Sequence, residues 1–322
     1  MDIYLRLPKL ALCSDRDKFP KYNVNSGSPE DWFSIQRLKK FGLFPINFDF
    51  FVNWSAVPPK VTRNIWIKSI LNSEIDSLLC DDGSVNESLI FNLLANLYGV
   101  DFLKVTSSFA FVNALYLEFL IFRDVDWYSN PKEKIIFSRA LNHAESLSFK
   151  SKVIGLEELM GKITLGSGGE VYVGKKGLIY GTSTLECYLS NTSSAYPGDA
   201  DMVLVDIKTS KPRCILEFKK HNLPSSVEEQ KISNYYPRPD KRKYDRLAVL
   251  RDFFAEDLAL VNVYYPTLDS HYQTKVEIIS GGIGSIKSCK EAMISLPSIS
   301  SEDSMDLYVK EFVWLLEEYF RS

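Results

Sequence analysis

Two acidic residues and a lysine stand at the ends of two neighbouring apolar runs in the middle of the chain. Asp201 opens the run at 202–205, and the triplet Glu217-Phe218-Lys219 closes the run at 214–216. A buried carboxylate is costly unless a counter-charge accompanies it. A divalent cation would supply that charge, so the pattern predicts a metal site with hydrolytic chemistry.

The spacing also predicts how these side chains meet. Residues two apart in a strand share a face, so an antiparallel hairpin would bring Asp201 opposite Glu217 with Lys219 on the same face. Carboxylate oxygens and water suit Mg²⁺. The metal would act as a Lewis acid, and the lysine could orient the attacking water or help to deprotonate it. We therefore expect Asp201 and Glu217 to be metal ligands and Lys219 to be catalytic.

The flanking patterns indicate an α/β fold with a mixed central sheet flanked by helices. Residues 1–130 read as a mainly helical N-terminal region for recognition, dimerisation or partner contacts, and no internal repeat is evident in them or beyond. Residues 131–322 form the expected catalytic domain. The expected helices cover 62–76, 89–97, 108–122, 133–149, 156–160, 240–257 and 303–320. Capping boxes are expected at Ser84, before the run at 89–97 that Gly99 could end, and at Ser225, where a further helix would begin. The expected strands cover 170–173, 178–180, 185–189, 201–206, 213–219, 260–265 and 275–279.

In this context Asp201 and Glu217-Phe218-Lys219 resemble the PD-(D/E)XK nuclease superfamily, over roughly residues 133–280. The resemblance implies a restriction-endonuclease-like core and metal-dependent hydrolysis of DNA phosphodiester bonds. It implies Mg²⁺ as cofactor, with Mn²⁺ as a substitute, and a restriction or other defence endonuclease. It also implies that Asp201 and Glu217 bind the metal and that Lys219 is the catalytic lysine.

The chain departs from the superfamily pattern in three places. The Pro-Asp pair is absent, and Asp199, which follows Pro197-Gly198, competes with Asp201 as ligand. Gln230 and Tyr235 are one residue too far apart to match a motif of some exonuclease-like branches. The additional acid that many members carry has several candidates: Glu145, Glu157, Glu158 and Glu186.

A basic segment follows the carboxylates. Residues 208–251 hold twelve Lys or Arg against five Asp or Glu, whereas the whole chain has a net charge of −3. Such an excess favours a polyanion, although a solvated helix face would also explain it. The predicted nucleic-acid contacts are Lys220, Arg238, Lys241, Arg242, Lys243 and Arg246. DNA is the expected partner, and a non-catalytic nucleic-acid-binding or assembly protein on the same fold is the alternative.

Cysteine and histidine usage excludes several other classes. The five cysteines are scattered and never form a CxxC pair, which argues against a disulfide framework and a zinc ribbon. The chain has three histidines and no GxSxG motif of a serine hydrolase. We find no signal peptide, and the most apolar stretch, 109–122, is too short to span a membrane. A cytoplasmic protein with no membrane contact is expected, as a homodimer because DNA has two strands to cut.

Overall fold

The computed structural model describes residues 10–19, 25–71, 74–143, 146–173 and 177–321. Contacts divide the chain into two compact units. Unit 1 comprises Met1–Leu7, Lys21–Asn47 and Ala200–Ser322, and unit 2 comprises Pro8–Pro20 and Phe48–Asp199. The predicted boundary near residue 130 is a different division of the chain, because it falls inside unit 2.

Unit 1 is built on a mixed sheet with the strand order β12-β11-β10-β9-β8. β8 and β9 form the expected antiparallel hairpin, β9 and β10 are parallel, and the two remaining pairs are antiparallel. The predicted strands at 201–206, 213–219, 260–265 and 275–279 are confirmed, and β12 was not anticipated. The bounds are β8 Gly198–Asp206, β9 Pro212–His221, β10 Ala259–Pro266, β11 Gln273–Ser280 and β12 Lys287–Ser295.

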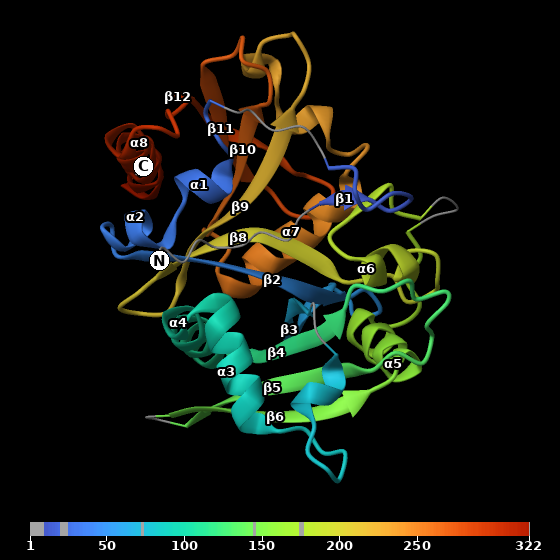
Figure 1. Cartoon of the computed structure of the whole chain (residues 1–322). Coiled ribbons are helices and arrows are strands. Elements are labelled where there is room, and N and C mark those ends of the chain that lie inside the picture. The colour runs from blue at the N-terminus through green and yellow to red at the C-terminus, as the bar shows by residue number, and fades with distance from the viewer. Residues whose placement is uncertain (1–9, 20–24, 72–73, 144–145, 174–176, 322) are drawn as a thin grey trace. The chain divides into compact units, whose positions relative to one another are not determined.

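Helices cover both faces of this sheet (Figure 1). One face packs against α7, where Tyr244 bonds Asn262 of β10, and the other against α8, where Tyr308 lies beside Thr274 of β11. The predicted basic helix and the C-terminal helix are confirmed. The helix expected from Ser225 is wrong, because only two short 3₁₀ turns form there. The bounds are α1 Pro29–Trp32, α2 Ile35–Lys39, η2 Val227–Glu229, η3 Ile232–Asn234, α7 Lys241–Phe254 and α8 Glu302–Arg321.

Unit 2 is also built on a mixed sheet, with the order β2-β3-β4-β5-β6. β3 and β4 are parallel, and the other neighbouring pairs are antiparallel. The bounds are β2 Leu43–Asn53, β3 Lys60–Leu71, β4 Tyr116–Arg123, β5 Ile135–His143 and β6 Ser146–Ile154. The helices expected over 62–76 and 133–149 are therefore wrong, and the N-terminal region is not mainly helical.

β3 was mistaken for a helix because both of its faces are buried. In β3, Ile65 and Ile67 point to one face and Trp66 and Lys68 to the other, and all four are covered. Alternation between apolar and polar residues is lost in a strand that is buried on both sides, so its apolar run does not reveal a period of two.

The helices of unit 2 lie on opposite faces of its sheet (Figure 1). α3 and α4 cover one face, through Tyr98 beside Ser69 and Phe109 beside Phe48. α5 and α6 cover the other with an apolar core around Trp66. The bounds are β1 Ala11–Leu12, η1 Ile75–Leu78, α3 Glu87–Tyr98, α4 Val100–Val112, α5 Leu156–Ser167, β7 Tyr180–Gly181 and α6 Thr184–Leu189.

Several local predictions in unit 2 can now be judged. The helix expected over 89–97 is confirmed as α3, and it ends at Gly99, whose φ of 84° suits glycine. Its cap is Asn86 rather than Ser84. The helix expected over 108–122 stops at Val112, and β4 follows. The strand expected over 185–189 is wrong, because these residues belong to α6.

Cys13 and Cys187 form a disulfide, with their Cα atoms 5.4 Å apart. The scattered cysteines argued against a disulfide framework, and this one bond within unit 2 was not anticipated. Among the described residues, no single helix has the length and apolar composition of a membrane span, and α3 with α4, bent by 103°, meets that criterion only as a pair.

Candidate functional site

The β8–β9 hairpin brings the predicted carboxylates together in unit 1. Met202 pairs with Leu216, and one step further along the register Asp201 opposes Glu217. The Asp201 carboxylate also accepts a hydrogen bond from the backbone N–H of Phe218, at 2.8 Å. Glu217 is 1% exposed, so its charge must be balanced inside the protein.

Two lysines balance that charge. Glu217 Oε1 lies 3.1 Å from Lys219 Nζ and 2.8 Å from Lys243 Nζ. The Lys243 ammonium is also 3.4 Å from Asp201 Oδ1, so one cation contacts both predicted metal ligands. Lys243 lies on α7 and was expected to contact nucleic acid, whereas the structure places it between the carboxylates.

Lys219 has further partners besides Glu217. Its ammonium also lies 2.7 Å from Asp240 Oδ2, and it stands 5.0 Å and 5.2 Å from the ring centroids of Tyr235 and Tyr244. Burial opposes its protonation, but the Glu217 carboxylate, together with Asp240, raises the pKa of Lys219 above its usual value. Lys219 is therefore an ammonium ion in this arrangement rather than a base.

A row of polar side chains extends from Glu217 across the sheet. Glu217 pairs with Asn262 of β10, which pairs with Glu277 of β11, so the three share one face. A chain of hydrogen bonds runs above them: Tyr244 donates to Asn262 at 3.0 Å, Asn262 to Tyr264 at 2.7 Å, and Tyr264 to Glu277 at 2.6 Å. Burial, with the Glu277 charge, raises the pKa of Tyr264, which keeps this donor protonated.

Two carboxylate oxygens on this face have no hydrogen-bond partner among the residues that the structure describes. They are Glu217 Oε2 and Glu277 Oε1, on residues that are 1% and 0% exposed. An unsatisfied buried carboxylate oxygen costs free energy that a cation, a proton or a water molecule would recover. The Asp201 and Glu217 pair therefore fits a small divalent cation. Both carboxylates already contact one cationic group, the Lys243 ammonium, and Glu217 Oε2 could accept a further ligand contact.

The other predicted acids that the structure describes lie in unit 2. Asp199 and Glu186 interact with Asp49 in unit 2. Glu157 and Glu158 lie in the first turn of α5, also in unit 2, and Glu145 lies outside the described residues. Within the described part of the chain, no cluster of three or more His, Cys, Asp or Glu could hold a metal ion.

Residues that the sequence analysis missed complete the site. Asp240, Asn262, Tyr264 and Glu277 are polar positions in a helix start and two central strands. The sequence feature that could have identified Asn262 and Glu277 is a polar residue within an apolar central strand. A buried polar side chain needs a hydrogen-bond partner, so such a residue indicates a polar neighbour. Gln230 and Tyr235 do meet, because the Tyr235 hydroxyl donates to Gln230 Oε1 at 2.8 Å.

The remaining predicted nucleic-acid contacts lie on β9, on α7 and in the segment before α7. Lys220 is partly buried on the opposite face of β9. Desolvation lowers its pKa there, and the charge of Glu30 on α1 opposes that shift. Lys241 pairs with Asp245, and Arg238 is exposed. Desolvation lowers the pKa of Arg242, and Arg246 is partly buried on α7.

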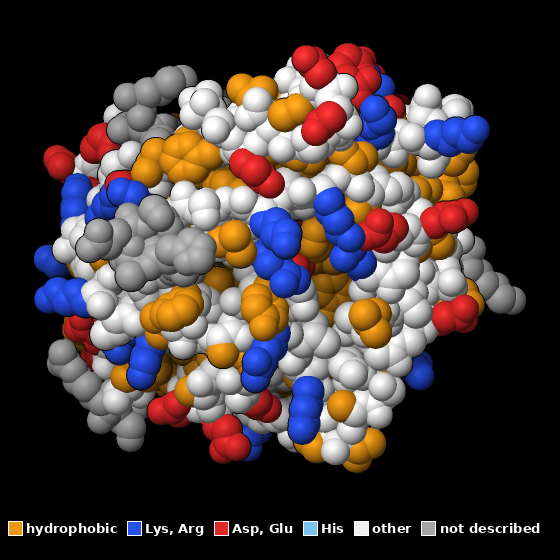
Figure 2. Space-filling model, turned by 90° about the horizontal axis from the view of Figure 1, so that it is seen from below, with side chains coloured by type: hydrophobic (Ala, Val, Ile, Leu, Met, Phe, Trp, Pro, Cys, Tyr) orange, Lys and Arg blue, Asp and Glu red, His pale blue; other side chains and the backbone are white. Residues whose placement is uncertain are grey.

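On the face drawn in Figure 2, described Lys and Arg side chains stand among hydrophobic ones rather than in a continuous basic surface.

Unit 2 contains a separate buried ion pair. Lys68 Nζ lies 3.3 Å from Asp49 Oδ1 and 3.8 Å from Glu186 Oε2, donates to Thr182 Oγ1 at 2.8 Å, and stands 4.6 Å from the centroid of the Tyr196 ring. Burial, with the charges of Asp199 and Glu186, outweighs Lys68 and raises the pKa of Asp49 to about 7.

This shift predicts a pH dependence of folding. In the unfolded chain Asp49 titrates near 3.8, and in the folded chain it titrates at about 7. Its stabilising contribution is therefore complete below the unfolded pKa and is lost as the pH rises through the folded pKa. Relative to Asp49→Asn, the free energy of unfolding of the wild type should fall between about pH 4 and pH 7 and then level off. Urea unfolding of both proteins across that range measures the difference, and an opposite slope would mean that Lys68 dominates.

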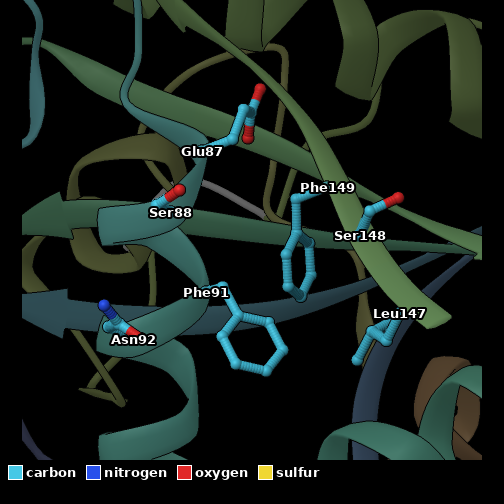
Figure 3. Close-up of a pocket in the computed structure, with 7 residues that line it drawn as sticks. All are labelled: Glu87, Ser88, Phe91, Asn92, Leu147, Ser148 and Phe149. Atoms are coloured by element: carbon cyan, nitrogen blue, oxygen red, sulfur yellow. The ribbon is translucent and has the colours of Figure 1, made fainter.

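A pocket of about 350 Å³ lies elsewhere in unit 2, between α3 and β6 (Figure 3). The rings of Phe91 and Phe149 lie across it from each other, with centroids 6.3 Å apart. Its one carboxylate, Glu87, is bonded to the backbone and hydroxyl of Ser151. The pocket offers an apolar hollow and no reactive group.

Comparison of the sequence with family models and curated proteins, and of the fold with solved structures, found no match.

Proposed function

We propose that the chain is a metal-dependent DNA endonuclease of the PD-(D/E)XK type, with its active site in unit 1. The observation that carries the proposal is the shared cation: Asp201 and Glu217 both contact the Lys243 ammonium, and Lys219 contacts the same Glu217 oxygen. The order of β8 to β11, with α7 between β9 and β10, supports the restriction-endonuclease-like part of the proposal.

In this proposal Asp201 and Glu217 would hold Mg²⁺ or Mn²⁺. The ion supplies Lewis-acid activation of a water molecule and of the phosphate. Lys219 keeps its proton, because Glu217 and Asp240 favour the ammonium form, so it stabilises negative charge on the phosphate and orients the water. Lys243 occupies the space between the carboxylates and would move to a phosphate oxygen of the bound DNA. Two lysines near one phosphate suit a polyanionic substrate.

The alternative is a non-catalytic nucleic-acid-binding or assembly protein. The observation that favours it is that the two lysines already neutralise the carboxylates, as in a structural ion-pair network. The restriction or defence context and the homodimer belong to the nuclease proposal.

The test is cleavage of supercoiled and linear DNA with Mg²⁺, Mn²⁺ or EDTA. We expect cutting that requires the metal and is lost in Asp201→Asn, because that variant removes one of the two carboxylate charges. Glu311→Gln, an exposed acid on α8, is the matched control and should cut like the wild type. Absence of cutting by folded protein that still binds DNA would favour the binding protein instead.

A further inference from the structure

The two units have the same strand layout. In unit 1 the pairs from β8 to β12 are antiparallel, parallel, antiparallel and antiparallel. In unit 2 the pairs from β2 to β6 follow the same sequence. In both units, strands that are consecutive in the sequence are also neighbours in the sheet, and only the parallel pair is joined by a crossover connection. The chain therefore contains a repeat of topology that its sequence did not reveal.

The helices repeat as well. In each unit, helix lies between the second and third strands of the layout, as α7 in unit 1 and as α3 with α4 in unit 2. In each unit, a further helix follows the fifth strand, as α8 and α5 respectively. α7 packs over the polar row of unit 1, and α3 with α4 packs over the equivalent face of unit 2.

The parallel pair relates the two units residue by residue. Residues 214–221 of β9 pair with 259–266 of β10, and residues 64–71 of β3 pair with 116–123 of β4. When the first residue pairs of these two ladders are aligned, Ile67 of unit 2 corresponds to Glu217 of unit 1. In the same alignment, Ser69 corresponds to Lys219.

The neighbouring strands extend the match. Asp49 pairs with Trp66 as Met202 pairs with Leu216, so Phe48 stands where unit 1 has Asp201. Across the sheet, the equivalents of Asn262, Tyr264 and Glu277 are Phe119, Ile121 and Ser138.

These positions in unit 2 form an apolar core instead of a site. The Phe48 and Phe109 rings lie 5.8 Å apart, and Phe119 is fully buried. Ser69 bonds the Tyr98 hydroxyl at 2.9 Å, in the place where Lys219 meets Tyr244. None of the six equivalent residues can carry a charge, so this face of unit 2 cannot bind a metal or a phosphate as unit 1 would.

We propose that unit 2 is a catalytically inert copy of unit 1, so that each chain has one hydrolytic centre and cuts one DNA strand at a time. This inference rests on the proposed nuclease function. A double-strand break then requires a second chain or a second binding event, which makes nicked DNA the first product.

Matched variants at one position of the repeat test the inference. Lys219→Ala and Ser69→Ala remove the equivalent side chains from the two units, and circular dichroism establishes that both proteins fold. Cleavage of supercoiled plasmid is then followed at increasing protein concentration, and Mn²⁺ binding is measured by calorimetry on the wild type, Glu217→Gln and Ser69→Ala.

We expect nicked circles to precede linear DNA, with the linear fraction rising more steeply with protein concentration. Lys219→Ala should abolish cutting, whereas Ser69→Ala should retain it and also retain Mn²⁺ binding, which Glu217→Gln should lose. Cutting that survives in Lys219→Ala, or is lost in folded Ser69→Ala, would overturn the inert copy but leave the nuclease standing. Absence of both cutting and Mn²⁺ binding in the wild type would overturn the proposed function and the inference with it.

Discussion

Glu217→Gln is expected to reduce metal-dependent DNA cleavage by at least about 100-fold, because residues that merely orient a metal ligand are typically worth 10–100-fold. Glutamine keeps the size of the side chain but removes the charge that Lys219 and Lys243 share. It also removes the carboxylate oxygen that has no protein partner and is available to a cation. Initial rates of plasmid nicking over a range of Mg²⁺ concentrations measure the loss.

The fold should survive this change. Lys219 keeps Asp240 and Lys243 keeps Asp201 as partners, so neither lysine is left without an opposite charge. DNA binding, measured in EDTA by fluorescence anisotropy, should be equal to that of the wild type or tighter, since one negative charge near the phosphates is gone. Cleavage at the wild-type rate by Glu217→Gln would refute its role as a metal ligand and would favour the structural ion-pair network.

Lys68→Met is expected to give the largest loss of stability, about 3–5 kcal/mol, because removing one partner of a buried ion pair leaves the other charge uncompensated. The Lys68 and Asp49 side chains are 6% and 5% exposed, and Lys68 also bonds Thr182. Urea unfolding at pH 8, where Asp49 is mostly ionised in the wild type, measures the effect.

Lys152→Met is the matched control. Lys152 pairs with Glu158 on the surface, with the two side chains 54% and 46% exposed, and such pairs contribute about 0–1 kcal/mol. The double variant Asp49→Asn with Lys68→Met should recover part of the lost stability, because it removes the stranded charge. A loss of less than about 1 kcal/mol in Lys68→Met would mean that solvent reaches the pair and that it is not buried in solution.

If unit 2 is the inert copy, Glu217→Gln and Lys68→Met should affect different properties of the protein. Glu217 belongs to a face where a row of polar side chains crosses the sheet, so we expect its replacement to affect the chemistry. Lys68 lies on the other face of its own sheet, among the packing of α5 and α6, and its loss concerns folding. A chain in which Lys68→Met abolished cutting while remaining fully folded would contradict this separation.

Local patterns were sufficient for the β8–β9 hairpin, α7 and α8. In each case, one strong pattern was present: an apolar run that ends in a charged residue, or a 3.6-residue period over more than three turns. The period of two predicted that Glu217 and Lys219 share a face of β9 and that Asp201 can share it from β8, and the register of the hairpin then opposes Asp201 to Glu217. The sequence by itself therefore determined the two carboxylates and the lysine that the candidate site contains.

Tertiary structure alone decided the rest. More than twenty residues further along the chain, Lys243 of α7 contacts the carboxylates and Asp240 at the start of α7 contacts Lys219. Asn262 and Glu277 join them only through strand pairing across β10 and β11. β3 of unit 2 looked helical because burial on both faces hides its alternation. The repeat was not visible in the sequence, because strand order is set by backbone hydrogen bonds and can be kept when the side chains differ. The same topology can therefore carry a polar face in one unit and an apolar face in the other.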